Sequence, residues 1–450
     1  MSDATSTGSI AELRRFKRYP KYRNPSVEWL GEIPAHWEVS RADAFLRYEK
    51  RQIEPSQISA ELVFHYSIPS VQDTGDGVFE SPSEIDSAKL QILGDRLLVS
   101  KLNPRKGVVL VASAKEVPTI CSTEFVPFEV RGCDLRWALY LFLAESTRQR
   151  LSAVVRSATR SHQRAEVSDI VKMWHGVASI PEQRAIAAFL DRETARIDKL
   201  VKKKERLIEL LLEKRSALIT CAVTKGLDPS VPMKDSGVEW LGEIPTHWEL
   251  ERIKWAARLE SGHTPDKKVE SYWQSGDIPW VSLADTEQLR EVDYIANTAV
   301  MTTSDGIAHS SAHILPERTV LFSRDASIGL CAITNAGVAV SQHFIGWVCG
   351  PRIRPEYLLF VLRSMTQELE RLTMGATVRT IGMPDVKSLS TPMPPVSEQE
   401  EIILYVHQNR SRIDALVGKV RDAIKQLKEF RSAIISAAVT GKIDVREEVV

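Results

Sequence analysis

Few residues in this 450-residue chain have the types and spacing that chemistry requires. His309 and His313 stand four positions apart in HSSAH, a spacing that would let both bind one zinc ion from the same face of a helix. No third ligand is spaced to complete such a site, and surface or turn histidines are the commoner source of this pattern. The sequence therefore predicts no metal site.

Nucleotide and methyl-transfer motifs are also incomplete. Gly441 and Lys442 are followed by Ile443, so there is no phosphate-binding loop of the GxxxxGK[ST] type. The MPPV stretch at 393–396 lacks the leading Asn or Asp and the aromatic residue of the amino-methyltransferase motif, and no glycine-rich loop for S-adenosylmethionine accompanies it. Its prolines are better explained as a break before a helix. No serine or cysteine nucleophile with a base emerges, so we expect no catalytic residues.

Composition narrows the class of protein. Residues are 43% hydrophobic, enough for sizeable cores, and at roughly 100–200 residues per domain the length predicts two to four domains. The formal net charge is zero, so overall charge does not indicate a polyanionic partner. The five cysteines include no CxxC pair, and neither a signal peptide nor a run of ~18 apolar residues is present. We therefore expect a soluble, cytoplasmic protein with reduced thiols and no membrane partner.

An internal repeat supplies the elements that must position any functional side chain. VEWLGEIPAHWEV at 27–39 returns as VEWLGEIPTHWEL at 238–250, with eleven of thirteen positions identical and an offset of 211 residues. IPEQRAIAAFLDRETARIDKLV from Ile180 matches VSEQEEIILYVHQNRSRIDALV from Val396 with an offset of 216. Because the offset changes between the two ends of the repeat, the middle segments differ in length.

Each repeat contains a long amphipathic helix. Apolar residues recur at alternating spacings of three and four, as in a coiled coil. Pro181 and Glu182 suit a helix start, and Gly226 and Gly441 suit helix ends. Each helix would hold about 40 residues and measure roughly 60 Å. Because one chain carries two copies of equal length, we predict an antiparallel pair within the chain rather than a self-associating coiled coil. The predicted seam residues are Ile197, Leu200, Leu207, Leu211, Leu218, Ile413, Leu416, Val420, Leu427, Phe430 and Ile434.

The variable middle segments have a mixed pattern. Stretches 97–114 and 319–348 are together rich in Val, Ile and Phe and broken by Gly, Pro, Asn and Asp, which is typical of strands and turns. Helical stretches follow from 135 and from 355, in the same order. The sequence therefore predicts an α/β (α+β) protein. Two globular domains would share a fold, be separated by two long antiparallel coiled-coil helices and be related by a pseudo-twofold internal repeat.

In the order and duplication of its motifs, the chain resembles the specificity (S) subunits of type I restriction-modification systems. The motifs that carry the resemblance are WLGEIPxHWE at 29–38 and 240–249, Glu-Gln at 182–183 and 398–399, Arg-Ile-Asp at 196–198 and 412–414, the stretches LLVSKLNPRKGVVLV and LFSRDASIGLCAI, and SGHTP at 261–265. The resemblance covers nearly all of the chain, although the first middle segment has no counterpart of SGHTP.

The resemblance implies a division of labour between subunits. Each globular domain would be a target recognition domain that reads one half of a bipartite, asymmetric site in double-stranded DNA. The helices would serve as spacer and docking scaffold for two modification (methyltransferase) subunits, and restriction subunits would join them. S-adenosylmethionine, ATP and Mg²⁺ would be used by those partners, with no cofactor bound by this chain. The implied parts are a basic N-terminal arm (1–25), target recognition domain 1 (26–179), long helix 1 (180–225), a linker plus target recognition domain 2 (226–395), and long helix 2 with a C-terminal tail (396–450).

The helices would act as a ruler. A pseudo-twofold protein should place its two reading faces about one turn of DNA apart, roughly 34–36 Å or 10 bp. Helices of roughly 60 Å can span that distance. We predict that lengthening either helix by one turn shifts the preferred spacer between half-sites, which selection from a randomised-spacer library would measure.

Local charge and turns indicate which residues would contact DNA. Residues 95–164 hold twelve Lys or Arg against six Asp or Glu, whereas residues 41–94 hold five against nine, so the later part of domain 1 should face phosphates. In residues 251–392 the counts are fourteen and sixteen, and there the expectation rests on the resemblance. Turn arginines can pair with guanine or clamp a phosphate, although solvated hairpins explain them equally well. The predicted DNA-binding residues are Lys101, Arg105, Lys106, Arg160, Arg164, Arg324, Gln342 and Arg379.

Other interpretations stay open. Gln342 could read adenine or take a buried hydrogen-bonding role, and Trp273 and Trp280 are more typical of a core than of base stacking. The basic arm RRFKRYPKYR could lie along phosphate or be a solvated tail. The chain could also be a fused methyltransferase–nuclease, against which the missing S-adenosylmethionine motif argues. A coiled-coil adaptor that binds only protein is the third class, and the polarised charge of the first domain argues weakly against it.

Overall fold

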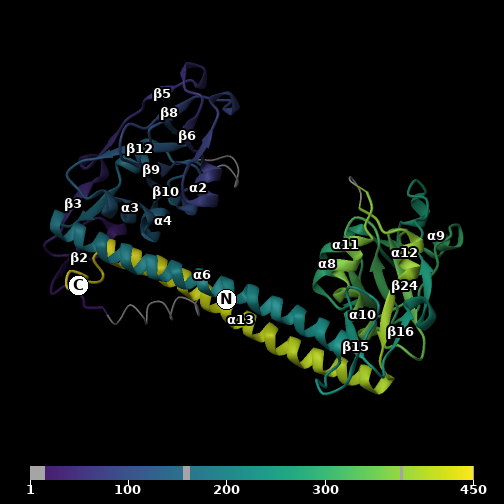
Figure 1. Ribbon diagram of the computed structural model, residues 1–450. Coiled ribbons are helices and arrows are strands. Elements are labelled where there is room, and N and C mark those ends of the chain that lie inside the picture. The colour runs from purple at the N-terminus through teal and green to yellow at the C-terminus, as the bar shows by residue number, and fades with distance from the viewer. Residues whose placement is uncertain (1–15, 156–162, 376–378, 449–450) are drawn as a thin grey trace. The chain divides into compact units, whose positions relative to one another are not determined.

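The computed structural model describes residues 16–155, 163–375 and 379–448. Contacts divide the chain into two compact units, whose elements are labelled in Figure 1. Unit 1 comprises residues 1–206 and 420–450, and unit 2 comprises residues 207–419. Each unit therefore combines one globular domain with parts of both long helices. None of the described helices is both long enough and apolar enough to cross a membrane.

The two long helices are α6 (Ile180–Lys225) and α13 (Val396–Val439). They hold 46 and 44 residues, which corresponds to about 69 and 66 Å. In unit 1, Arg431 Nε of α13 donates to Asp198 Oδ1 of α6 at 3.0 Å. In unit 2, Arg215 of α6 donates to Asp414 Oδ1 of α13 at 2.8 Å. The first half of each helix thus pairs with the second half of the other, and the predicted antiparallel arrangement is confirmed.

The predicted seam is wrong at three positions. Leu200, Leu207 and Leu416 are 40%, 42% and 44% exposed, whereas their neighbours Val201 and Val417 are buried. Both members of each neighbouring pair fit an apolar repeat, but a step of one residue turns the side chain by about 100° around the helix axis. After Ile197 and after Ile413, the next buried residue of the seam is therefore four positions further on, at Val201 and Val417, and not three positions as predicted. The other predicted seam residues are buried or half-buried, namely Ile197, Leu211, Leu218, Ile413, Val420, Leu427, Phe430 and Ile434.

The globular domain of unit 1 has a four-stranded sheet in the order β10-β9-β12-β4 and a five-stranded sheet in the order β5-β8-β11-β6-β7. The first sheet comprises β4 (Leu46–Tyr48), β9 (Arg96–Ser100), β10 (Val109–Ala112) and β12 (Phe125–Val130). The second comprises β5 (Gln52–Ile53), β6 (Val63–Tyr66), β7 (Val78–Glu80), β8 (Lys89–Gln91) and β11 (Thr119–Ser122). The helices are α2 (Ile68–Thr74), α3 (Leu135–Leu143), α4 (Glu145–Ala153) and α5 (Val167–Val171).

The globular domain of unit 2 has a five-stranded sheet in the order β17-β24-β21-β22-β19 and a three-stranded sheet in the order β20-β18-β23. The first sheet comprises β17 (Ala257–Ser261), β19 (Tyr294–Ile295), β21 (Val320–Ser323), β22 (Cys331–Thr334) and β24 (Phe344–Cys349). The second comprises β18 (Ile278–Val281), β20 (Met301–Thr302) and β23 (Ala339–Val340). The helices are α7 (Ile253–Ala256), α8 (Thr286–Glu291), α9 (Ser304–Ala308), α10 (Pro355–Ser364), α11 (Thr366–Arg371) and α12 (Met383–Ser388).

The two domains share a sheet. The order β10-β9-β12-β4 in unit 1 corresponds strand for strand to β22-β21-β24-β17 in unit 2, and in both sheets these neighbours pair antiparallel. A pair of helices follows the sheet in each case, α3 with α4 and α10 with α11. This agreement confirms the predicted α/β (α+β) class and the common fold of the two middle segments. Each predicted domain helix is, however, two helices separated by a short break.

A short ladder joins the two ends of each repeat. In unit 1, β3 (Glu38–Arg41) pairs antiparallel with β13 (Trp174–Val177), so that Glu38 lies opposite Val177. In unit 2, β16 (Glu249–Arg252) pairs with β25 (Ser390–Met393), so that Glu249 lies opposite Met393. β16 thus lies 211 residues after β3, and β25 lies 216 residues after β13, which are the two offsets found in the sequence. Two smaller ladders, β1 (Tyr22–Arg23) with β2 (Ile33–Pro34) and β14 (Met233–Asp235) with β15 (Glu243–Pro245), are also equivalent, and there both partners are related by the offset of 211.

The repeated phrase and the Glu-Gln pair meet in each unit. Trp37 Nε1 donates to Glu182 Oε1 at 3.1 Å, and Trp248 Nε1 donates to Glu398 Oε2 at 3.0 Å. The histidine before each tryptophan lies 2.9 Å from the same carboxylate. Both tryptophans are buried. The phrase is therefore a joint that fixes a globular domain to the start of a long helix.

The glutamine after each glutamate ties the same helix to the first domain helix. Gln183 Oε1 accepts a hydrogen bond from the backbone N–H of Asp134, just before α3, at 2.7 Å. Gln399 Oε1 accepts from the N–H of Arg354, just before α10, at 2.9 Å. Each glutamine thereby satisfies a backbone donor at a partly buried helix start, where an unpaired N–H would be costly.

The described part of the basic arm packs against unit 1. The Phe16 ring lies 5.5 Å from the Phe189 ring of α6, and the buried Tyr19 ring contacts Trp37 edge-on. Tyr22 Oη donates to the backbone carbonyl of Gly441, just after α13, at 3.1 Å. From Phe16 onward the arm is therefore packed against unit 1 and is not a solvated tail, while Lys17, Arg18, Lys21 and Arg23 are exposed. Its first residues lie outside the described part of the chain.

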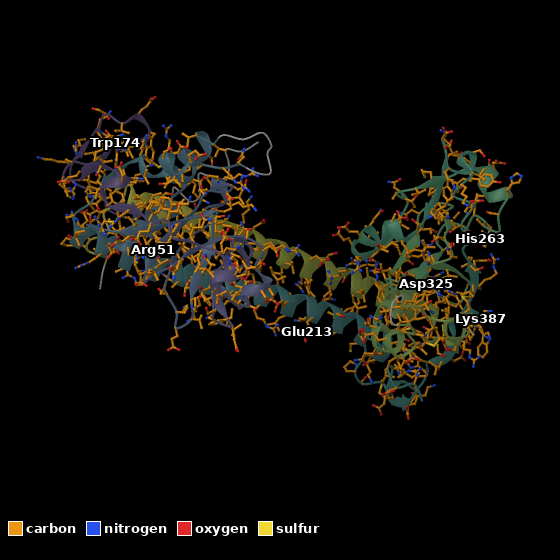
Figure 2. The ribbon with its side chains drawn as sticks, turned by 90° about the horizontal axis from the view of Figure 1, so that it is seen from above. Arg51, Trp174, Glu213, His263, Asp325 and Lys387 are labelled. Carbon is orange, nitrogen blue, oxygen red and sulfur yellow. The ribbon has the colours of Figure 1, made fainter. Side chains whose placement is uncertain are left out.

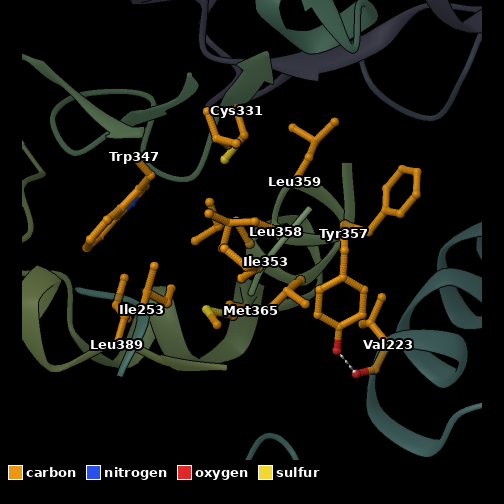
Figure 3. Close-up of a cluster of buried hydrophobic side chains, with 14 of the residues drawn as sticks. Val223, Ile253, Cys331, Trp347, Ile353, Tyr357, Leu358, Leu359, Met365 and Leu389 are labelled. Carbon is orange, nitrogen blue, oxygen red and sulfur yellow. Dashed lines mark hydrogen bonds between the residues drawn. The ribbon is translucent and has the colours of Figure 1, made fainter. Parts of the chain in front are cut away.

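The core of unit 2 connects its domain to α6. Trp347 of β24 and Tyr357 of α10 are fully buried in one apolar cluster, part of which is drawn in Figure 3. Tyr357 Oη lies 3.3 Å from the backbone oxygen of Val223 on α6, the contact drawn as a dashed line in Figure 3. This burial raises the pKa of Tyr357 well above its ordinary value, so the hydroxyl stays a hydrogen-bond donor.

Candidate DNA interface

The first candidate turn connects β9 to β10 in unit 1. The short 3-10 helix Pro104–Lys106 is flanked by Asn103 and Gly107, whose φ angles of 48° and 61° lie in the left-handed region. Asparagine and glycine are the residues that tolerate this conformation best. The resulting tight turn leaves Arg105 and Lys106 exposed to solvent.

A second segment lies against this turn. The backbone N–H of Asn103 donates to the carbonyl of Gln163 at 2.7 Å, and the N–H of Ala165 donates to the carbonyl of Lys101 at 3.0 Å. Leu102 and Arg164 are paired across this bridge. The fold therefore brings four of the predicted DNA-binding residues together at one edge of the unit 1 domain, where the turn after β9 meets residues 163–165. They are Lys101, Arg105, Lys106 and Arg164.

Arg164 differs from the other three because it has a carboxylate partner. Its Nε and NH2 atoms donate to the two oxygens of Glu124 at 3.1 and 2.8 Å. A guanidinium held in this bidentate way must leave Glu124 before it can pair with a base. Arg160 falls outside the described residues.

The corresponding turn of unit 2 follows β21. The N–H of Arg324 donates to the carbonyl of His343 at 3.0 Å, and the N–H of Ile381 donates to the carbonyl of Arg324 at 2.9 Å. The N–H of Ala326 donates to the carbonyl of Arg379 at 2.8 Å. Three segments far apart in the sequence thus meet at one edge, and they bring Arg324, Gln342 and Arg379 into the same neighbourhood.

The two edges have the same backbone hydrogen bonds. In unit 1, Lys101 donates to the carbonyl of Glu124 and accepts from Ala165, in the pattern that Arg324 makes with His343 and Ile381 in unit 2. Lys101 and Arg324 therefore occupy equivalent positions.

By the same pattern, Arg379 corresponds to Gln163. The carbonyl of Gln163 accepts a hydrogen bond from the N–H of Asn103, two residues after Lys101. The carbonyl of Arg379 accepts one from the N–H of Ala326, two residues after Arg324. Arg164 corresponds to Thr380, one residue after Arg379, because the two are paired in the equivalent bridges Leu102–Arg164 and Asp325–Thr380.

Asp325 organises the edge of unit 2, where its side chain is labelled in Figure 2. Its carboxylate accepts from Thr380 Oγ1, lies 3.0 Å from His343 Nδ1 and forms an ion pair with Arg324 at 3.5 Å. It is largely buried. Asp325 thus fixes the orientations of Arg324 and His343. Sequence reasoning missed this residue, although its position directly after Arg324 on the turn was a usable signal.

Gln342 projects from the turn between β23 and β24. It is exposed, and its Oε1 accepts a hydrogen bond from Thr264 Oγ1 of the SGHTP stretch. In this arrangement Oε1 is the acceptor, so Nε2 is the donor group of the side chain. Because it is exposed, Gln342 does not have a buried structural role.

The histidine pair HSSAH has carboxylate partners. His309 Nδ1 lies 2.9 Å from Asp305, and His313 Nε2 lies 3.1 Å from Glu260. Within the described residues, no group of three His, Cys, Asp or Glu side chains is placed to hold a metal ion.

Comparison with known proteins gives the family. The model of the type I restriction modification DNA specificity domain matches residues 245–426. The type I restriction enzyme MjaIX specificity subunit of Methanocaldococcus jannaschii is 29% identical over 164 residues, which are 36% of this chain and 38% of that protein. The MjaVIII specificity subunit of the same organism is 21% identical over 430 residues, which are 92% of this chain and 94% of that protein.

Solved structures share the fold. A chain from a structure of an assembled type I restriction-modification system superposes with a TM-score of 0.65 at 16% identity, over 90% of this chain and 98% of that one. The HsdS subunit of Thermoanaerobacter tengcongensis gives a TM-score of 0.55 at 16% identity, over 91% of this chain and 98% of that one. Residues 245–426 therefore carry the DNA specificity domain of type I restriction-modification systems, and over nearly its whole length the chain is similar to the specificity subunits of these systems.

Proposed function

We propose that each globular domain reads one half of a bipartite, asymmetric site in double-stranded DNA. The observation that carries this proposal is the equivalence of Lys101 and Arg324, which stand on the same turn of the same sheet in two separate domains. Two similar but diverged edges suit two similar but different half-sites. Basic side chains on such turns can reach phosphates or base edges.

We also propose that the long helices dock two modification subunits, which restriction subunits then join. Several large apolar side chains of α6 and α13 are exposed, as expected for a surface that a partner covers. They are Leu200, Leu207, Leu210, Leu404, Tyr405 and Leu416. The partners would use S-adenosylmethionine, ATP and Mg²⁺, whereas this chain would bind no cofactor and catalyse no step. Its five free cysteines suit a reducing, cytoplasmic location.

Co-expression with modification subunits tests the function. The complex is purified, supplied with S-adenosylmethionine and genomic DNA, and the methylated positions are sequenced. We expect one bipartite motif with methylation in both halves, and no methylation by the chain alone. Methylation by the isolated chain would instead support a fused enzyme, and a complex without sequence preference would support a protein-only adaptor.

The spacer role has its own test. One heptad is inserted into both helices where the two units divide, after residues 206 and 419. Seven residues add about 10 Å of helix, or roughly 3 bp of DNA. We expect the same two half-sites with a longer preferred spacer, and an unchanged spacer would contradict the role of the helices as a ruler.

A further inference from the structure

Unit 2 contains a cavity that the proposed reading of base edges does not require. Its volume is about 690 Å³, within the range of ligand-binding pockets. It is lined by Thr264, Lys267, Trp273, Trp280, Ser341 and Gln342, among others. Residues from the SGHTP stretch, from β18 and from the turn after β23 thus converge on one hollow.

Two indole rings form an aromatic wall of this cavity. The centroids of Trp273 and Trp280 lie 4.8 Å apart with the rings at 71°. Trp273 Nε1 donates to the carbonyl of Asp266 at 3.1 Å, and Trp280 Nε1 donates to the carbonyl of His263 at 3.4 Å. Because the backbone satisfies both N–H groups, the rings offer apolar surface to an occupant. Trp280 is buried, as its sequence pattern favoured, whereas Trp273 is only half-buried and keeps part of its ring accessible.

Polar groups converge where two neighbouring strands end. β18 and β23 run parallel, with Trp280 opposite Ala339, and the N–H of Ser341 donates to the carbonyl of Val281 at 2.9 Å. Ser341 is buried, and its Oγ has no hydrogen-bond partner among the described residues. Together with Gln342 Nε2, this hydroxyl supplies hydrogen-bonding capacity that an occupant can use.

The cavity adjoins the candidate DNA edge. Gln342 and His343 line it, and the carbonyl of His343 accepts the bond from Arg324 that builds the edge. A second hollow of about 300 Å³ is lined by Arg290, Ser327 and Arg379, beyond the same turn. Cationic groups that suit phosphates therefore lie close to the aromatic wall that suits a planar ring.

We propose that this cavity binds one unpaired nucleobase of the DNA half-site that unit 2 reads. The base stacks against Trp273 and accepts hydrogen bonds from Gln342 Nε2 and Ser341 Oγ. A base must leave the duplex stack before it can enter a pocket of a protein. This inference rests on the proposed function, because it requires DNA on this edge.

Binding of matched duplexes by the specificity–modification complex tests the proposal. Once the methylated site is known, one set of duplexes is fully paired, and the others each carry a single mismatch within the half-site of unit 2. We expect the native complex to bind at least one mismatched duplex more tightly than the paired one. Trp273→Ala should remove this preference, with a loss of roughly 5- to 150-fold, the value of one stacked base. Trp273→Phe should keep most of it.

Trp255→Ala is the matched control, because Trp255 lies in the same unit, is 63% exposed and does not line the cavity. We expect this variant to bind every duplex as the native complex does. If Trp273→Ala also behaves as native on every duplex, the base pocket is wrong while the proposed function stands. If the native complex shows no specific binding, the proposed function fails and the pocket with it.

Photocrosslinking tests the pocket without any substitution. 5-Iodouracil is placed at successive positions of the half-site in the native complex, and crosslinked peptides are identified by mass spectrometry. A crosslink from one position to Trp273 or Trp280 supports the proposal. Crosslinks confined to residues outside the cavity would overturn it.

Discussion

Trp37 donates its indole hydrogen to Glu182 across 145 residues of sequence, at 3.1 Å, and this bond helps to fix the first domain to the start of α6. Trp248 and Glu398 make the equivalent bond in unit 2. The phrase and the Glu-Gln pair are therefore two halves of one joint, and the joint occurs twice.

Removal of the joint carboxylate should destabilise unit 1. Glu182→Ala leaves the buried Trp37 N–H without an acceptor, so we expect the free energy of unfolding to fall by about 1–3 kcal/mol. Urea denaturation followed by tryptophan fluorescence measures the change. Glu213→Ala is the control on the same helix, because Glu213 is exposed (Figure 2), and it should alter stability by less than about 0.5 kcal/mol. Equal effects of the two variants would contradict the joint.

The register of the helix pair can be tested with neighbouring residues. Val417→Ala removes buried methyl groups from the seam and should cost about 1–2 kcal/mol of unfolding free energy. Leu416→Ala removes more atoms but from an exposed position, and should cost less than about 0.5 kcal/mol. Thermal or urea melts of the two variants give the comparison. A larger loss for Leu416→Ala would restore the register expected from sequence.

His175 should make unit 1 sensitive to acid. Burial lowers the pKa of His175 to about 3 from 6.5, and its Nε2 has no hydrogen-bond partner among the described residues. Between these pH values the unfolded chain binds a proton at this position and the folded chain does not, so stability falls as pH is lowered through the interval.

His175→Leu should weaken this pH dependence, as urea denaturation at pH 7 and pH 5 would measure. His263→Leu, at an exposed position labelled in Figure 2, should leave the dependence unchanged. An unaltered pH dependence in the His175 variant would refute the assignment.

Arg324 should carry sequence preference in one half-site. Arg324→Ala in the specificity–modification complex should reduce discrimination at one base pair by about 1–3 kcal/mol, the value of a bidentate contact. Lys387→Ala, which alters an exposed basic residue of the same unit on α12, should keep the native motif. Sequencing of methylated sites reports both. Loss of preference in the other half-site would show that the wrong domain has been assigned to that half.

Arg105 and Lys106 should act mainly on phosphates. Their double replacement by alanine should weaken binding to all sequences alike and lower the slope of log affinity against log salt by about 2, close to 0.9 per lost contact. Fluorescence anisotropy at several salt concentrations measures this slope. Arg51→Ala, at an exposed position in the acidic part of the same domain, serves as the control and should keep the native slope. An unchanged slope in the double variant would place this turn away from DNA.

The repeat, the two long helices, their antiparallel pairing and the mixed α/β class could all be predicted from the sequence. These follow from periodicity and from duplicated phrases, which neighbouring residues encode. The sequence also pointed to the basic turns, because asparagine, proline and glycine mark the turn that carries Arg105.

The sequence could not predict which of Leu200 and Val201 is buried, because both fit an apolar repeat and packing against the partner helix selects Val201. Only the tertiary structure decided that Asp325 holds Arg324 and His343, and that Gln342 and Trp273 share a cavity. Such groupings join residues that are far apart in the chain. They depend on strand pairing, which no local pattern specifies.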